Sequence, residues 1–333
     1  MESTGFKALI VEQTAPGQFI RRIGERRIGD LPPGEVVVKV RYSSLNYKDA
    51  LSATGNPGVT RTFPHTPGID AAGEVVACAD GRFAVGEQVI VTGFDLGMNT
   101  AGGFGQYIRV PSAWGVSLPD GMSPRESMAL GTAGFTAALS VVKLAQSGVT
   151  PDQGDVLVTG ASGGVGSVAV ALLARAGYRV VAATGKLAEE GGLRELGAAE
   201  VIHRDDLLKG AERPMMKERW AGAVDVVGGE TLAAVLKATR YGGTVTCCGL
   251  VGSADLNVTV FPFILRGVSL LGIDSVQCPM PLRRDVWQRL AGDWKLDTLQ
   301  QVVHETVLDE LEEPILGMLR GEAKGRTIVN LWG

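Results

Sequence analysis

A glycine-rich turn is the part of this sequence with the clearest chemistry. Ala161, Gly163 and Gly166 keep the spacing of the pattern G-x-G-x-x-G, with alanine at the first position. Gly163 and Gly164 would let the backbone approach a pyrophosphate, and Gly166 would let the following helix pack closely on the preceding strand. Because free N–H groups at a helix start attract phosphates, we predict a dinucleotide-binding turn, the alternative being a purely structural glycine turn.

The end of the next apolar stretch indicates which dinucleotide would bind. An NAD site usually carries Asp or Glu about 20 residues beyond the glycines, whereas this chain has Thr184, Gly185 and Lys186 there and no acid before Glu189. A hydroxyl, a bare backbone N–H and a cation suit a 2′-phosphate. We therefore predict NADPH, the alternative being that Lys186 is a solvated lysine at a strand end. Arg204 could reach the same phosphate or be a surface charge.

Strands and helices alternate around these residues. The apolar residues 156–158 predict a buried strand, and Val168, Leu172 and Leu173 then recur at helical spacing until Gly177. A serine cap, a proline and an acid at residues 123–126 predict an earlier helix start. We expect further strands at residues 178–183, 200–202, 225–227, 244–248 and 268–273, the last at a sheet edge that could pair with a second subunit. The alternation predicts an α/β fold, a doubly wound parallel sheet, over residues 123–275.

The first 120 residues have a different pattern. Short strands separated by turns are expected at residues 6–12, 35–42, 73–77 and 88–91, which is typical of a compact, barrel-like β domain. The last 60 residues contain a polar helical region and a final strand at 327–330, and we expect them to return to the β domain. The predicted β domain therefore comprises residues 1–122 and 276–333.

Composition limits the class of protein. A chain of 333 residues with 45% hydrophobic and 20% charged residues suggests an ordinary globular protein of two domains. The net charge of −4 gives no electrostatic reason to expect nucleic acid or an anionic membrane as partner. No apolar run approaches a membrane span, and the first residues lack the layout of a signal peptide. The four cysteines form no C-x-x-C pair, which favours a reducing cytoplasm.

The order of these parts resembles the medium-chain dehydrogenase/reductase superfamily, whose members insert a Rossmann domain into a GroES-like barrel domain. The resemblance covers essentially the whole chain, and its motifs are SLNYKD at 44–49, PGIDAAG at 67–73, VGEQV at 85–89, GGFGQY at 102–107 and GTAGFTA at 131–137. The chain is most similar to the zinc-independent quinone oxidoreductase branch. Within that branch, residues 184–186, 226–229 and 325–327 most resemble the acrylyl-CoA reductase (NADPH) group. This resemblance implies an oxidoreductase. The possible edge strand at residues 268–273 leads us to expect a homodimer, the alternative being a tetramer.

The same resemblance implies that no metal is bound. Zinc-containing members carry cysteine where this chain has Asn46, and a His-Glu pair where it has Ile69 and Asp70. Ile69 cannot ligate a metal, and an amide is a poor substitute for a thiolate. Residues 92–104 contain no cysteine for a structural zinc, and His65 is a lone histidine in a proline-bounded loop. We therefore predict an enzyme without zinc.

The chemistry expected without a Lewis acid is reduction of the activated double bond of an enone or thioester. The resemblance to the acrylyl-CoA reductase group implies that the substrate is acryloyl-CoA and the product propanoyl-CoA. Hydride would reach the β-carbon, and hydrogen-bond donors would hold the resulting enolate. We expect Asn46 to be an orienting donor, Tyr47 a nicotinamide contact or proton source, and Asp70 a residue that orients Asn46 or a water. The alternative is that Asn46 and Asp70 only cap local turns and that Tyr47 packs its ring.

The resemblance implies a set of NADPH contacts that includes the residues of the glycine turn and Arg204. They are Ser162, Gly163, Gly164, Val165, Arg204, Leu250, Ile264, Ser275 and Arg326. Arg326 lies between a glycine and a threonine before the last strand, and its guanidinium would suit a phosphate or carboxylate. Two other functions remain open at this point: a quinone oxidoreductase or broad enal/enone reductase, and a non-enzymatic, NADPH-binding structural protein of the kind found among relatives in eye lens.

Overall fold

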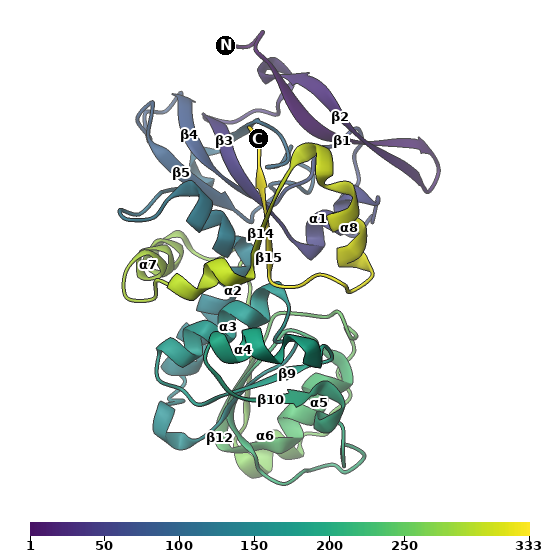
Figure 1. Cartoon of the computed structure of the whole chain (residues 1–333), viewed down its shortest axis with the longest axis vertical. Helices are drawn as coiled ribbons and strands as arrows, with labels where there is room; N and C mark the ends of the chain where they lie inside the picture. Colours follow the sequence, from purple (N-terminus) through teal and green to yellow (C-terminus); the bar gives the residue numbers. More distant parts are fainter. The chain divides into compact units, whose positions relative to one another are not determined.

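The computed structural model describes all 333 residues, which divide into two compact units. The first, here called the β unit, comprises Met1–Thr132, Val276–Ala291 and Val303–Gly333. The second, the nucleotide unit, comprises Ala133–Ser275 and Gly292–Val302. Both ends of the chain, purple and yellow in Figure 1, therefore belong to the β unit, and the teal and green middle of the chain forms the nucleotide unit.

The β unit contains a seven-stranded sheet in the order β14-β15-β3-β4-β5-β7, with β6 paired to β3. Its strands are β3 (Val36–Leu45), β4 (Asp70–Cys78), β5 (Gln88–Thr92), β6 (Tyr107–Val110), β7 (Gly115–Ser117), β14 (Val303–Val307) and β15 (Arg326–Asn330). Side chains alternate along β3, so that Val36, Val38 and Val40 enter one hydrophobic core while Val37 enters another. This fold confirms the GroES-like β domain expected from the sequence.

Two strand pairings position the end of β3. β15 runs antiparallel to β3 with Thr327 opposite Leu45, and β4 runs antiparallel to it with Ala72 opposite Tyr42. Residues that are far apart in the sequence therefore meet where β3 ends. The helices of this unit are α1 (Tyr47–Ala53), which packs on α8 (Glu312–Leu319), the start of α2 (Pro124–Gln146), and α7 (Met280–Ala291).

A separate hairpin, β1 (Gly5–Ala15) and β2 (Gln18–Arg27), completes the β unit. The first strand was expected at residues 6–12, and β2 was not predicted. Polar and charged residues make up most of β2, and its side chains alternate between exposed and half-buried without a buried apolar face. A strand of this kind lacks the period-two hydrophobic signal on which sequence prediction depends.

The nucleotide unit is built on a six-stranded parallel sheet in the order β10-β9-β8-β11-β12-β13. The strands are β8 (Val156–Val158), β9 (Val180–Thr184), β10 (Ala198–His203), β11 (Trp220–Asp225), β12 (Thr239–Cys247) and β13 (Ser269–Gly272). Its helices are the rest of α2, α3 (Gly164–Arg175), α4 (Glu190–Glu195), α5 (Gly229–Ala238) and α6 (Phe261–Arg266). The strand order reverses between β8 and β11, which is the switch point at which such sheets bind ligands. The doubly wound sheet is therefore confirmed.

The core of this sheet follows the strand register. Leu157 lies opposite Val181 on one side and Ala223 on the other, and Ala223 lies opposite Val245. These side chains belong to one buried cluster. Strands buried on both faces are short and continuously apolar, which is why residues 156–158 could be predicted from the sequence.

The structure differs from the sequence prediction in three places. A strand was expected at residues 225–227, but β11 ends at Asp225 because the Asp225 carboxylate accepts a hydrogen bond from the Gly228 N–H and closes a turn. The unit boundary was expected at 122/123, whereas the contacts divide after Thr132. Residues 292–302, expected in the β domain, pack in the nucleotide unit, where Asp293 O accepts from Arg175 Nε at 2.6 Å.

Helix α2 explains the boundary. Its predicted start is confirmed, because α2 begins at Pro124, directly after Ser123. The Ser123 N–H donates to Glu126 Oε2 and the Glu126 N–H donates to Ser123 Oγ, which together form a capping box. The helix is interrupted at Gly131, where φ is 54° and ψ is −157°. The division between the two units, after Thr132, therefore falls next to this interruption.

By length and composition α2 could cross a membrane, but 83% of its apolar window is buried, as in the core helix of a globular protein.

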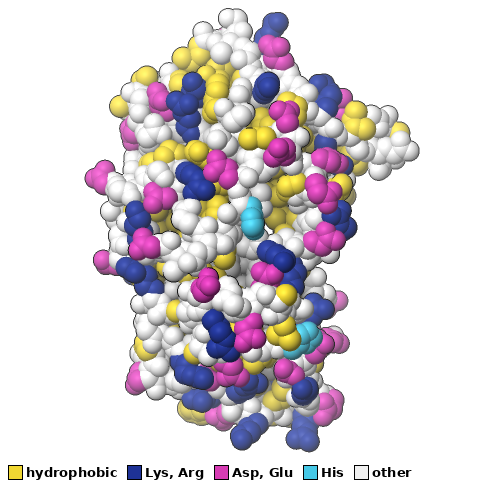
Figure 2. Space-filling model, in the orientation of Figure 1, with side chains coloured by type: hydrophobic (Ala, Val, Ile, Leu, Met, Phe, Trp, Pro, Cys, Tyr) yellow, Lys and Arg dark blue, Asp and Glu magenta, His cyan; other side chains and the backbone are white.

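The surface carries charges of both signs. On the face shown in Figure 2, basic and acidic side chains are interspersed, with hydrophobic side chains between them. The acidic side chains, which outnumber the basic ones and give the chain its net charge of −4, therefore do not gather in one region of this face.

Candidate active site and dinucleotide site

A buried carboxylate, Asp70, organises the polar side chains at the end of β3. Its Oδ1 accepts from Thr132 Oγ1 at 2.5 Å, and its Oδ2 accepts from Ser44 Oγ at 2.6 Å. Oδ2 also accepts from Asn46 Nδ2 and from the Thr132 N–H, both at 2.8 Å. Asp70 is fully buried, and four donors satisfy the acceptor capacity of an ionised carboxylate. Asp70 is thus a buried acceptor that holds the Asn46 amide, and its role in the reaction stays a prediction.

Arg326 lies on the other side of the Asn46 amide. It is 2% exposed, and it donates from Nε to Ala129 O at 3.1 Å, from Nη1 to Asn46 Oδ1 at 3.2 Å and from Nη2 to Ser44 Oγ at 2.9 Å. Burial lowers the pKa of Arg326, and the charges of nearby carboxylates oppose that shift. The guanidinium is therefore directed at protein acceptors of its own unit, and a direct contact with NADPH stays a prediction.

Asn46 is the N-cap of α1, but its side chain does more than cap a turn. The amide is held between Asp70 and Arg326, and its Nδ2 also approaches Ser44 O and Asp49 Oδ2 at 3.3 Å each. Asn46 is only 8% exposed. Both amide hydrogens thus face protein acceptors, an arrangement that fits a positioning residue better than a donor to substrate.

Asp49 is a member of this site that the sequence analysis missed. It is fully buried, its Oδ2 accepts from the Asn46 N–H at 2.8 Å, and its Oδ1 accepts from the Ile69 N–H at 2.8 Å. Burial and, second, the charge of Asp70 raise the pKa of Asp49 to about 7. The group therefore changes its protonation in the range where enzymes work. The spacing Asn-x-x-Asp before a helix was the available signal, because an acid at this position often binds the N-cap N–H.

These six residues, here called the polar cluster, are Ser44, Asn46, Asp49, Asp70, Thr132 and Arg326. Gly131 lets the backbone of α2 approach them: a Cβ at this position would lie 2.5 Å from Asp70 Oδ2 and 2.7 Å from Arg326 Nη2. Its φ of 54° is also unfavourable for any residue with a side chain. Glycine is therefore required here for two independent reasons.

Tyr47 is the exposed residue beside the polar cluster. It is the first residue of α1, directly after Asn46, and 42% of its surface is exposed. Of the three residues predicted to be catalytic, Tyr47 alone is accessible to a ligand to this extent, since Asn46 and Asp70 are buried.

The predicted dinucleotide turn has the expected geometry within the nucleotide unit. Helix α3 begins at Gly164, and no side chain caps its N-terminus. A Cβ on Gly166 would lie 2.3 Å from Gly160 O, so the close packing of helix on strand requires glycine. Uncapped N–H groups and a backbone without side chains fit the phosphates of a dinucleotide. This turn, residues 160–166, is called the phosphate turn below.

The residues expected to select the cofactor gather at the ends of β9 and β10. Thr184 Oγ1 lies 2.9 Å from Ser162 Oγ and accepts from the Lys186 N–H at 3.0 Å. Arg204 lies against Gly185, where a Cβ would be 3.0 Å from its Nε. The structure thus brings these five predicted positions together on one edge of the sheet.

Asp225, the last residue of β11, lies at the same carboxyl-terminal edge of the sheet. The sequence analysis did not identify it as a site residue. It is fully buried at the end of β11, and it accepts from Thr159 Oγ1 at 2.7 Å and from the Gly228 N–H at 2.8 Å. Burial raises the pKa of Asp225. Because Thr159 directly follows β8, this carboxylate joins the start of the phosphate turn to the turn after β11.

The remaining predicted cofactor positions lie in later segments. A Cβ on Gly228 would lie 3.2 Å from Leu250 Cα, which places Leu250 near the turn after β11. Ile264 is in α6 with an exposed side chain, and Ser275 is the last residue of that part of the nucleotide unit. Their contacts with NADPH stay predictions.

Comparison with known proteins adds family information to this geometry. Residues 32–120 match the alcohol dehydrogenase GroES-like domain, and residues 164–292 match the zinc-binding dehydrogenase family. The chain is 47% identical over 330 residues to the putative quinone oxidoreductase YhfP of Bacillus subtilis, covering 99% of this chain and 100% of that protein. It is 44% identical over 327 residues to the acrylyl-CoA reductase AcuI of Ruegeria pomeroyi, covering 98% and 99%.

Solved structures agree with these relatives. The yhdH oxidoreductase from Salmonella enterica in complex with NADP superposes with a TM-score of 0.94 at 45% identity, covering 98% of this chain and 99% of that one. Bacillus subtilis yhfP with NAD bound superposes with a TM-score of 0.96 at 47% identity, covering 99% and 100%. The similarity therefore extends over both units.

Proposed function

The chain belongs to the zinc-independent branch of the medium-chain dehydrogenase/reductase superfamily, and we propose that it reduces the activated double bond of acryloyl-CoA with NADPH. It is an oxidoreductase, as its relatives are. The observation that carries the choice of substrate is the 44% identity, over 98% of the chain, to an acrylyl-CoA reductase.

The choice of NADPH rests on the residues at the ends of β9 and β10. One relative was solved with NADP and another with NAD, so the family alone leaves the cofactor open. Here the selectivity position holds Lys186 after Thr184 and Gly185, and Arg204 lies against the same backbone. Two cations and a hydroxyl favour a 2′-phosphate, whereas an NAD site would place a carboxylate there.

The polar cluster suggests how the chain assists the reaction. NADPH held at the phosphate turn and at residues 184–186 would supply a hydride to the β-carbon of the substrate, and negative charge would build on the thioester oxygen. A proton from water would then reach the α-carbon and complete propanoyl-CoA. In our proposal the hydroxyl of Tyr47 donates a hydrogen bond to that oxygen, because Tyr47 is exposed while Asn46 is not. Asn46, Asp70 and Arg326 are positioning residues that fix the junction of β3 and α1 from which Tyr47 projects.

Asp49 sets the charge of the polar cluster. With Asp70 and Asp49 ionised and Arg326 cationic, the cluster carries a net negative charge, and protonation of Asp49 makes it neutral. A neutral cluster opposes the developing oxyanion less than an anionic one. The pKa of about 7 for Asp49 therefore links its protonation to turnover near neutral pH. No step in this scheme involves a metal, and we propose that the enzyme works without zinc.

The test compares two substrates. Recombinant protein is assayed for NADPH oxidation with acryloyl-CoA and with 1,4-benzoquinone, and we expect the higher kcat/KM with acryloyl-CoA. A higher kcat/KM with benzoquinone would instead support the second candidate, a quinone oxidoreductase, which the 47% identity to a putative quinone oxidoreductase favours.

We also propose that the protein is a cytoplasmic homodimer whose subunits pair along β13. This strand is one of the two edge strands of the six-stranded sheet, the other being β10, and exposed edges readily pair with another chain. Exposed apolar side chains concentrate between β12 and β13, at Leu250, Val251, Val260, Phe261, Ile264 and Leu265. The four cysteines are free, as in a reducing compartment.

A further inference from the structure

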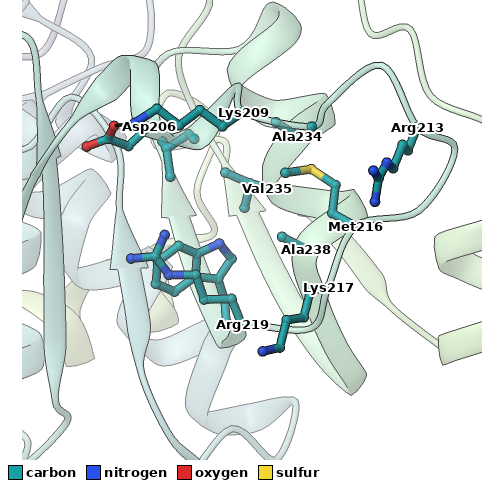
Figure 3. A pocket seen from close by; sticks show the side chains of 12 residues that line it. Asp206, Lys209, Arg213, Met216, Lys217, Arg219, Ala234, Val235 and Ala238 are labelled. Atoms are coloured by element: carbon teal, nitrogen blue, oxygen red, sulfur yellow. Dashed lines mark hydrogen bonds and ion pairs between the residues drawn. The ribbon is translucent and has the colours of Figure 1, made fainter.

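The nucleotide unit contains a cavity that the proposed reaction does not use. It has a volume of about 260 Å³ and lies between the connection 208–219 and the C-terminal half of α5 (Figure 3). Its other walls are the 3₁₀ turn Arg204–Leu207, which contributes Asp206 and Leu207, and the start of β11. Neither the phosphate turn nor residues 184–186 line it, so the cavity is separate from the predicted dinucleotide site.

The inner wall of the cavity is apolar. Leu207, Trp220 and Val235 are buried members of the core of this unit, and Met216 packs against them. Figure 3 shows Met216, Val235 and Ala238 around the centre of the cavity. Such a wall favours the apolar body of a ligand, and a methionine sulfur makes favourable contacts with an aromatic ring.

The rim is cationic. Lys209, Arg213, Lys217 and Arg219 line the cavity, against one acid, Asp206. Figure 3 shows these cations at the margin, with the amino group of Lys209 directed at Asp206.

The acids near the rim do not remove its positive charge. Three ion pairs involve rim cations: Asp206 Oδ1 is 2.5 Å from Lys209 Nζ, Glu212 Oε1 is 3.8 Å from Arg213 Nε, and Glu200 Oε1 is 3.7 Å from Arg219 Nη2. The guanidinium carbon of Arg219 also lies 4.2 Å from the centre of the Trp220 ring. The Arg213 and Glu212 side chains are largely exposed, and ion pairs of that kind contribute little. The rim therefore keeps the capacity to bind an anion.

We propose that this cavity binds a small aromatic carboxylate, with its ring against Met216, which is half-buried, and its carboxylate at the cationic rim that includes Arg213 and Lys217. The volume is below the roughly 300–1,000 Å³ of sites for drug-sized ligands, which limits the ligand to a single ring. A planar guanidinium matches a carboxylate bidentately. An uncharged ring would forgo the rim, and a small aliphatic acid would leave the apolar wall uncovered.

Benzoate is the probe, and calorimetric titration of the NADPH-saturated enzyme is the measurement. Occupying the dinucleotide site first removes competition from that site. We expect saturable benzoate binding, and weaker binding of both benzamide, which lacks the charge, and acetate, which lacks the ring.

The matched variants are Lys217→Glu and Lys143→Glu. Both lysines are exposed and belong to the nucleotide unit, and Lys143 lies in α2 outside the cavity. Lys217→Glu should raise the dissociation constant of benzoate by about tenfold, equivalent to about 1.4 kcal/mol, and Lys143→Glu should leave it unchanged. No saturable binding of benzoate, or equal binding by both variants, would overturn the proposal.

Discussion

Asp49 is the residue of the polar cluster whose protonation changes near neutral pH. As the pH rises through about 7, its ionisation adds a second carboxylate charge beside Asp70, close to where we place the developing oxyanion. We predict that kcat falls over this range in the parent enzyme and that Asp49→Asn, which stays neutral, lacks this inflection. The measurement is kcat against pH for both proteins, and an unchanged inflection in Asp49→Asn would exclude Asp49 as its source.

The same pKa has a consequence for stability. The pKa of Asp49 rises on folding from 3.8 to about 7, so the folded state binds the proton more tightly than the unfolded chain does. The contribution of Asp49 to stability is therefore fully present below pH 3.8 and is lost as the pH rises to about 7.

Lys186 is the residue on which the cofactor prediction depends. Removing a cation that pairs with a partly solvated phosphate typically costs less than removing a buried one, because solvent screens the pair. We predict that Lys186→Ala raises the KM for NADPH about tenfold, equivalent to about 1.4 kcal/mol, and leaves the KM for NADH nearly unchanged. Steady-state kinetics with both cofactors is the measurement. Equal use of NADPH and NADH by the parent enzyme would contradict the prediction.

At the scale of elements, the polar cluster exists because three segments converge at the end of β3. The pairing of β15 with β3 brings in Arg326, the pairing of β4 with β3 brings in Asp70, and the break in α2 brings in Thr132. The sequence motifs also contained Ser44, Asp49 and Thr132, but roles were predicted only for Asn46, Tyr47 and Asp70. The sheet register that brings Arg326 and Asp70 to the end of β3 cannot be predicted from local motifs, and so the polar cluster as a whole was missed.

Gly131 tests this convergence. Gly131→Ala would combine an unfavourable φ with a contact of 2.5 Å to Asp70, so we predict loss of stability and of most activity. Gly148→Ala is the matched control, because Gly148 also has a positive φ, of 83°, but nothing within 4 Å of an added Cβ. The control should lose about 1–2 kcal/mol of stability and keep its activity. Melting temperatures and kcat for both variants are the measurements, and equal effects would contradict the account.

The nucleotide unit was easier to predict than the β unit, for a physical reason. Parallel strands such as β8 are buried on both faces, and a glycine turn with a following helix marks their ends. In the β unit, by contrast, the strand β2 has no buried apolar face. Within the nucleotide unit the end of β11 was the exception, because hydrogen bonds from Thr159 and Gly228 fix it and no local pattern reveals them.

At the scale of the whole molecule, the proposed dimer depends on the segment between β12 and β13. We predict that Leu265→Asp, at a position 60% exposed in α6, converts the dimer to a monomer because it places a charge in an apolar interface. Val85→Asp, at a position 72% exposed in the β unit, is the control and should remain dimeric. Light scattering after size-exclusion chromatography gives both masses. A parent protein that is itself monomeric would refute the homodimer.

The central claim is that the enzyme reduces the double bond of acryloyl-CoA with a hydride from NADPH, and product analysis with deuterium-labelled NADPH tests it most directly. The enzyme is incubated with acryloyl-CoA and NADPH carrying deuterium at the transferred position, and the product is examined by mass spectrometry and NMR. We predict propanoyl-CoA with one deuterium at the β-carbon and an unlabelled α-carbon. Intact acryloyl-CoA after full incubation with an active preparation, or propanoyl-CoA without label at the β-carbon, would contradict the account.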